Sequence, residues 1–115
     1  MEDRPSVSLL TLLRLVQKSP MMYVGIADSA RGAQLDRLEV LISGYSLALT
    51  WHGLRDPGYD LYMQFSPYLE KRFGLPVNRG PIRAIRDASK SDSQAWKMFW
   101  RLLWEFTAAH EPPAD

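Results

Sequence analysis

The chain contains no cysteine among its 115 residues. Disulfide bonds, thiolate zinc sites and a cysteine nucleophile are therefore excluded, and the absence agrees with a reducing compartment. No apolar run approaches the roughly 20 residues that a membrane-spanning helix needs. Residues 1–6 carry the acidic pair Glu2 and Asp3 and lack the apolar core of a secretion signal. We therefore expect a cytoplasmic protein without a membrane partner.

Patterns of known catalytic and cofactor sites are missing as well. The two histidines, His52 and His110, have no second ligand at the spacing that a helical metal site uses. No nucleophile turn, phosphate-binding loop or dinucleotide fingerprint occurs. We predict no catalytic residues, no cofactor and no metal, and hence a protein that is not an enzyme. A small enzyme of a class without local motifs is the alternative that remains.

What the chain does contain is typical of one folded domain. Hydrophobic residues make up 46% and charged residues 23%, so the whole of 1–115 is expected to form a single helical domain with frayed ends at 1–5 and 111–115. The formal net charge is +1. Dedicated nucleic-acid binders are usually clearly basic, so this charge argues against nucleic acid as the partner.

Apolar residues recur at helical spacing in five segments, and no segment alternates as a strand would. The expected helices run from Ser6 or Ser8 to Lys18, from Leu35 to His52, from Ser66 to Phe73, from Ile82 to Ala88 and from Ala95 to Phe106. Residues 19–25 are expected to be extended or turn-like, and Gly32 to lie in a loop. Gly44 falls within the second helix, where close approach of a neighbouring helix would explain it. We therefore predict an all-α fold, a compact single-domain bundle of about five helices.

The last predicted helix is unusually apolar. Trp96, Trp100 and Trp104 follow one another at intervals of four residues and so share one side of it. Its apolar arc spans roughly 200°, whereas a surface helix needs little more than about 100°. Such a helix is either central to its own domain or partly covered by a partner.

Two groups of residues are candidates for binding a partner. The first is a polar turn at 55–62 that we expect to be exposed, with anchors at Asp28, Asp56, Tyr59, Asp60 and Tyr62. Tyrosines half-buried beneath the turn are the alternative reading of Tyr59 and Tyr62. The second group is a basic stripe of Arg79, Arg83, Arg86 and Lys90, which could bind phosphates or an acidic protein surface. A solvated face balanced by nearby aspartates is the interpretation we favour for this stripe.

The segment Lys-Ser-Pro-Met-Met-Tyr-Val-Gly at 18–25 resembles part of the ATPase domain of DNA gyrase B. In that family a following helix carries a glutamate base and an Asp-Asn pair. The corresponding helix here has Leu41 in place of the glutamate and Gly44 and Tyr45 in place of the pair. The ATPase interpretation is therefore rejected.

A second resemblance covers almost the whole chain. The turn Lys-x-Pro-x-Met-Tyr-x-Gly, the later Ser-Gly-Tyr-Ser-Leu-Ala-Leu, a Tyr-Leu-Glu-Lys-Arg-Phe-Gly helix and the final Trp-rich helix resemble a group of small bacterial proteins. That group is similar in turn to the immunity proteins of polymorphic toxin systems. The matching positions are Pro20, Met22, Tyr23, Gly25, Leu38, Gly44, Tyr45, Phe73 and Gly74, whereas Met21 replaces a common glycine.

This resemblance implies a protein that binds a cognate toxin protein and neutralises it. The alternative is a regulatory or adaptor domain that forms a homodimer or larger homo-oligomer, with the tryptophan-rich C-terminal helix as its interface.

Overall fold

A computed structural model describes residues 8–110, and the expected fraying of 1–5 and 111–115 lies outside this range. Within it the chain forms seven helices and no strand, which confirms the all-α fold. The helices are α1 (Leu9–Lys18), α2 (Pro20–Val24), α3 (Arg31–His52), α4 (Pro57–Tyr62), α5 (Phe65–Phe73), α6 (Pro81–Asp87) and α7 (Asp92–His110). No helix in this part of the chain combines the length and apolar character needed to cross a bilayer.

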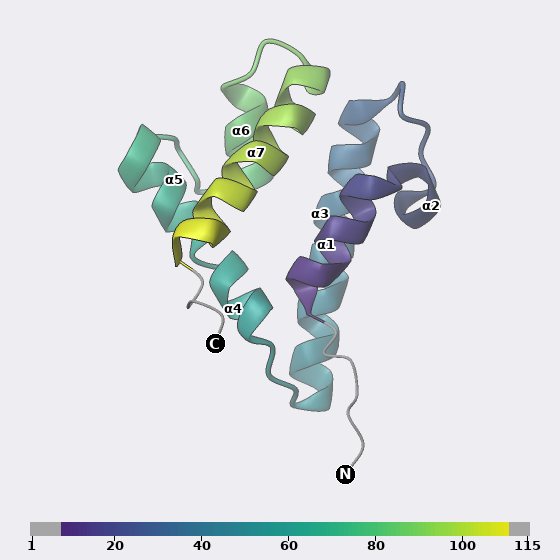
Figure 1. The fold of residues 1–115 in the computed structure, drawn as a ribbon, viewed down its shortest axis with the longest axis vertical. Helices are drawn as coiled ribbons and strands as arrows, with labels where there is room; N and C mark the ends of the chain where they lie inside the picture. The colour runs from purple at the N-terminus through teal and green to yellow at the C-terminus, as the bar shows by residue number, and fades with distance from the viewer. Residues whose placement is uncertain (1–7, 111–115) are drawn as a thin grey trace.

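Two groups of helices make up the molecule (Figure 1). The first contains α1, α2 and α3, the second contains α5, α6 and α7, and α4 joins them. Helix α7 contacts α3 of the first group, the joining helix α4, and α5 and α6 of its own group. It therefore packs the second group against α3, while α4 also contacts α1.

Several predicted helix ends are confirmed. The Ser8 hydroxyl accepts the Thr11 N–H at the start of α1 (3.2 Å). Helix α7 begins at Asp92, three residues before the predicted Ala95, and the Ser91 hydroxyl accepts the Gln94 N–H there (3.1 Å). Helices α3 and α5 end at Gly53 and Gly74, whose φ angles of 59° and 70° lie in the left-handed region that glycine enters most easily. Local capping chemistry was therefore sufficient to place these boundaries.

Other local predictions are wrong. Residues 20–24 form the short helix α2 instead of an extended turn, because Pro20 occupies the first helical position, where its fixed φ is suitable. Helix α4 begins inside the predicted turn, with Asp56 as its N-cap. Helix α5 starts at Phe65, one residue before the predicted Ser66.

The predictions for Gly32 and Gly44 are both wrong, because the close approach of another helix expected at Gly44 occurs at Gly32. Gly32 lies in the first turn of α3, and a Cβ added there would lie 2.3 Å from the Asp92 carboxylate. Gly32 therefore permits α3 and the start of α7 to approach each other. At Gly44 an added Cβ would meet nothing within 4 Å, so no neighbouring helix of this chain explains that glycine.

The core is centred on the inner aromatic residues of α7. Phe99 and Phe106 are at most 1% exposed, and both pack against Phe65 of α5, with ring centroids 6.0 and 5.5 Å apart. Trp96 and Trp100 are also buried. The wide apolar arc of this helix is therefore enclosed mainly by the rest of the chain.

Candidate functional site

Asp56, predicted to be an exposed anchor, is buried. Its side chain accepts the Leu9 N–H at 2.8 Å and the Gly58 N–H at 2.9 Å, and it also accepts the Tyr45 hydroxyl. Only 6% of the residue is exposed. Asp56 thus joins the starts of α1 and α4 to the middle of α3, and its role as an exposed partner contact was wrongly predicted.

Tyr45 is held in its protonated form by this arrangement. Partial burial, followed by the hydrogen bond and charge of Asp56, raises the pKa of Tyr45 to about 12. The hydroxyl therefore remains a donor to Asp56 throughout the neutral pH range.

The other predicted anchors are dispersed. Tyr62 is 5% exposed, and burial raises its pKa above the ordinary tyrosine value, so the exposure expected for it is also wrong. Tyr59 is half-buried, and its hydroxyl shares a hydrogen bond of 2.7 Å with Ser46. Asp60 is exposed beside α3, whereas Asp28 lies beside Arg31 in the loop before α3. The five residues do not form one surface.

The basic stripe is divided as well. Helix α6 covers only Pro81–Asp87, so Arg79 precedes it and Lys90 follows it. The Arg86 guanidinium binds Asp36 at 2.5 Å and Asp92 at 3.3 Å, and Arg83 lies 3.9 Å from Asp87. Partial burial lowers the pKa of Arg86, but the hydrogen bonds and charges of the two aspartates outweigh it and raise that pKa overall. Arg86 is therefore a link between α3, α6 and α7 and is not available as a phosphate-binding cation.

An exposed apolar stripe that the sequence analysis missed runs along the outer side of α3. Val40, Leu47 and Trp51 are 65%, 57% and 78% exposed, and Leu54, just beyond the helix, is 60% exposed. At about 100° per residue, the three helical side chains lie within about 40° of one another and opposite the buried side of α3. We call Val40, Leu47, Trp51 and Leu54, together with Gly44 in the same row, the outer face of α3. The signal was present in the sequence as apolar residues on both sides of one helix.

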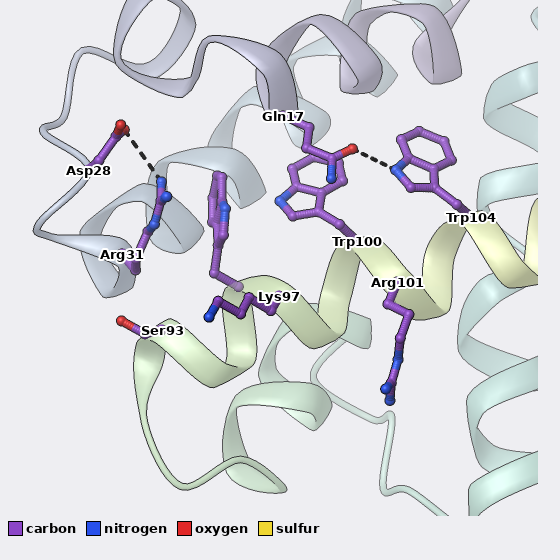
Figure 2. Close-up of a pocket in the computed structure, with 9 residues that line it drawn as sticks. Gln17, Asp28, Arg31, Ser93, Lys97, Trp100, Arg101 and Trp104 are labelled. Carbon is purple, nitrogen blue, oxygen red and sulfur yellow. Dashed lines mark hydrogen bonds and ion pairs between the residues drawn. The ribbon is translucent and has the colours of Figure 1, made fainter.

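A groove of about 650 Å³ runs along the tryptophan side of α7 (Figure 2). Trp96, Trp100 and Trp104 form its inner wall, with successive ring centroids 5.4 and 5.9 Å apart. Its remaining lining residues are Gln17, Asp28, Arg31, Ser93, Lys97 and Arg101.

Polar contacts fix the two ends of this row of indoles. The Trp104 indole N–H donates to the Gln17 side-chain oxygen at 2.7 Å, as the dashed line in Figure 2 marks. The Arg14 guanidinium lies 4.2 Å from the Trp104 ring centre, and Arg31 lies 4.7 Å from that of Trp96. Among the described residues, the buried Trp100 indole nitrogen has no hydrogen-bond partner.

Metal-binding side chains do not gather in the described part of the chain. Across residues 8–110, no three histidine, aspartate or glutamate side chains lie together in an arrangement that could hold an ion. His110 instead packs against Phe106, and its Nδ1 lies 2.9 Å from the backbone oxygen of that residue.

Comparison with known proteins gave no relative. No protein-family model matches the chain, and neither the curated proteins nor the solved structures contain a match. The candidate surfaces are therefore the outer face of α3 and the groove along α7, both identified from the residues of this chain alone.

Proposed function

We propose that the protein is a non-enzymatic immunity protein that binds and neutralises a cognate toxin protein, and that the outer face of α3 is the centre of its recognition surface. The resemblance of the sequence to immunity proteins supports the type of activity. The exposed apolar residues of α3 support the location, and they are the observation on which this part of the proposal depends.

The composition of this face suits a protein partner. An exposed tryptophan such as Trp51 is costly to leave in water, and tryptophan is among the residues that contribute most to protein interfaces. Val40 and Leu47 extend the apolar surface along the helix, while Gly44 leaves a gap in which a partner side chain can be accommodated.

Polar groups border the carboxyl end of the outer face. A shallow pocket of about 260 Å³ lies between α3 and α4, and Thr50, Leu54, Arg55 and Asp60 are among its lining residues. An apolar centre with a polar rim is the usual arrangement of a protein interface. Among the residues predicted from the sequence to bind a partner, Asp60 is exposed at the edge of this surface.

Co-expression with the toxin encoded by the neighbouring gene tests the proposal. The wild-type chain should rescue growth and co-purify with the toxin. The double variant Leu47→Ala/Trp51→Ala should lose rescue and bind at least about 100-fold more weakly, because central interface residues contribute about 2 kcal/mol or more each.

The matched control is Met63→Ala/Phe73→Ala, which removes two apolar side chains that are 52% and 46% exposed and do not belong to the outer face of α3. This variant should bind and rescue as the wild type does. Equal binding by both double variants would remove the outer face of α3 from the proposal. A neighbouring toxin that the wild-type chain does not bind would contradict the immunity function itself.

A homo-oligomer is the second candidate, but with a different interface from the one expected. The tryptophan helix is largely covered within the chain, whereas α3 offers a self-complementary row. If two copies of α3 pack antiparallel, Gly44 of one can face Leu47 of the other, and Val40 can face Trp51. Light scattering that reports a dimer, and a monomer for Leu47→Ala/Trp51→Ala, would support this candidate.

A further inference from the structure

We propose that the groove along α7 binds a small anion that carries two or more carboxylate or phosphate groups. The groove is separate from the outer face of α3, so this inference is independent of the proposed toxin binding. It rests on the charge of the groove, on one buried donor and on the size of the space.

Cationic side chains outnumber acidic ones around the groove. Lys97 and Arg101 lie one helical turn apart on α7, both are exposed, and neither forms an ion pair with a described residue. In Figure 2 the Lys97 head lies toward the same end of the groove as Arg31, whereas Arg101 extends from α7 away from the Trp100 and Trp104 indoles. The single acidic lining residue, Asp28, accepts hydrogen bonds from Arg31 and Gln34. Two or more negative groups on a ligand could therefore be neutralised at separate points.

The indole nitrogen of Trp100 supplies the second observation. Trp100 is 2% exposed and lines the groove, yet its N–H has no hydrogen-bond partner among the described residues. In Figure 2 this nitrogen lies on the edge of the ring that faces the Arg31 end, away from Trp104. The edge-on contact with Trp96 offers it at most an aromatic face, which is a weaker acceptor than an anionic oxygen. The nitrogen has almost no accessible surface, so a ligand oxygen at the Arg31 end would pair this donor after a shift of the Trp96 ring.

The space favours a compact anion over a nucleic-acid strand. A volume of about 650 Å³ falls within the range of small-molecule sites. Stacking of bases requires open aromatic faces, but Trp96 is 6% exposed, and Arg14 and Arg31 lie over the outer two rings. The exposed lining residues are Lys97, Arg101, Gln17, Ser93 and Asp28, and Arg31 is half-buried.

Tryptophan fluorescence tests this proposal directly. The substitution Trp51→Phe removes the one tryptophan outside the groove, so the remaining three report on the groove itself. Citrate and pyrophosphate, titrated separately at constant ionic strength, should each be tested for a saturable change. The anion that binds more tightly identifies carboxylate or phosphate as the preferred group. No saturable change with either anion would overturn the proposal.

A charge-matched pair of variants distinguishes a site from general attraction. In the Trp51→Phe background, Lys97→Ala/Arg101→Ala should weaken binding by at least about 10-fold. The control Arg55→Ala/Lys71→Ala removes the same number of positive charges away from the groove and should change binding less than about twofold. Equal loss in the two double variants would overturn the proposal.

The role of the buried donor is tested by Trp100→Phe, with Trp104→Phe as its matched control. Isothermal titration calorimetry should show about 10-fold weaker binding for Trp100→Phe and a smaller change for Trp104→Phe, whose N–H is already paired with Gln17. Unchanged binding by a folded Trp100→Phe protein would contradict the assignment of this donor. If that variant does not fold, the Lys97 and Arg101 variants decide the proposal.

Discussion

Helices α3 and α7 both carry apolar residues on more than one side, but the two helices differ in how many of these residues are buried. Helix α7 contacts helices of both groups and has neighbours on several sides, so its aromatic residues are mostly buried. Helix α3 packs with one side only, and Val40, Leu47 and Trp51 remain exposed on the other. A wide apolar arc therefore indicates core or interface according to the position of the helix in the fold. The arc alone does not distinguish the two.

The largest difference in the free energy of unfolding is expected between tryptophan substitutions in the two helices. Trp100→Ala in α7 should lower the free energy of unfolding by about 3–5 kcal/mol, because it removes a large buried side chain. Trp51→Ala in α3 should change it by no more than about 0.5 kcal/mol, as for most surface positions. Urea denaturation followed by far-UV circular dichroism measures both. Similar small losses for the two variants would contradict the central position of α7.

The next largest difference in the free energy of unfolding is expected between two aspartates at α4. Asp56→Ala should lower the free energy of unfolding by about 2–3 kcal/mol, because it removes a helix cap and the acceptor of the buried Leu9 N–H and the half-buried Tyr45 hydroxyl. Asp60→Ala, four residues away and exposed, should stay within about 0.5 kcal/mol. Thermal unfolding of the two purified variants under one condition provides the measurement. A melting temperature for Asp56→Ala equal to that of Asp60→Ala would argue against the buried network.

The two glycines of α3 give the smallest expected effect. Gly44→Ala should raise the free energy of unfolding by about 0.5–1 kcal/mol, because alanine favours the helix and its methyl group meets nothing. Gly32→Ala should gain less, since the Asp92 carboxylate must move away. Urea denaturation can resolve the difference. A loss of stability at Gly44 would show that the outer face of α3 is covered within the monomer.

The sequence predicted the fold better than it predicted the surfaces. Helical periodicity and capping residues are local properties, and they correctly indicated α1, most of α3, and the ends at Gly53 and Gly74. The burial of Asp56 could not be predicted, because its partners Leu9 and Tyr45 lie 47 and 11 residues away. The interpretation favoured for Arg86, a cation balanced by nearby aspartates, agrees with its bond to Asp92, but the bond to Asp36, 50 residues earlier, could not be predicted. Such contacts depend on tertiary packing.

The outer face of α3 was predictable in part. Val40, Leu47 and Trp51 share one side of the helix by spacing alone. Whether that side is covered depends on where α7 and the other helices pack, and this information is absent from the periodicity. The groove along α7 is a similar case, because Arg31 and Gln17 reach it from separate segments.

The bond between Asp56 and the Leu9 N–H also has a consequence for synthesis of the chain on the ribosome. At about 5–20 residues per second, Asp56 is added roughly 2–9 s after Leu9, since 47 positions separate the two. During this interval α1 can contact α2, which follows it directly, but the first turn of α1 lacks one of its native acceptors. A nascent chain that stalls before position 56 would therefore expose an incompletely anchored first helix to proteases and chaperones. Completion of the first turn of α1 thus depends on a residue that is added 47 positions later.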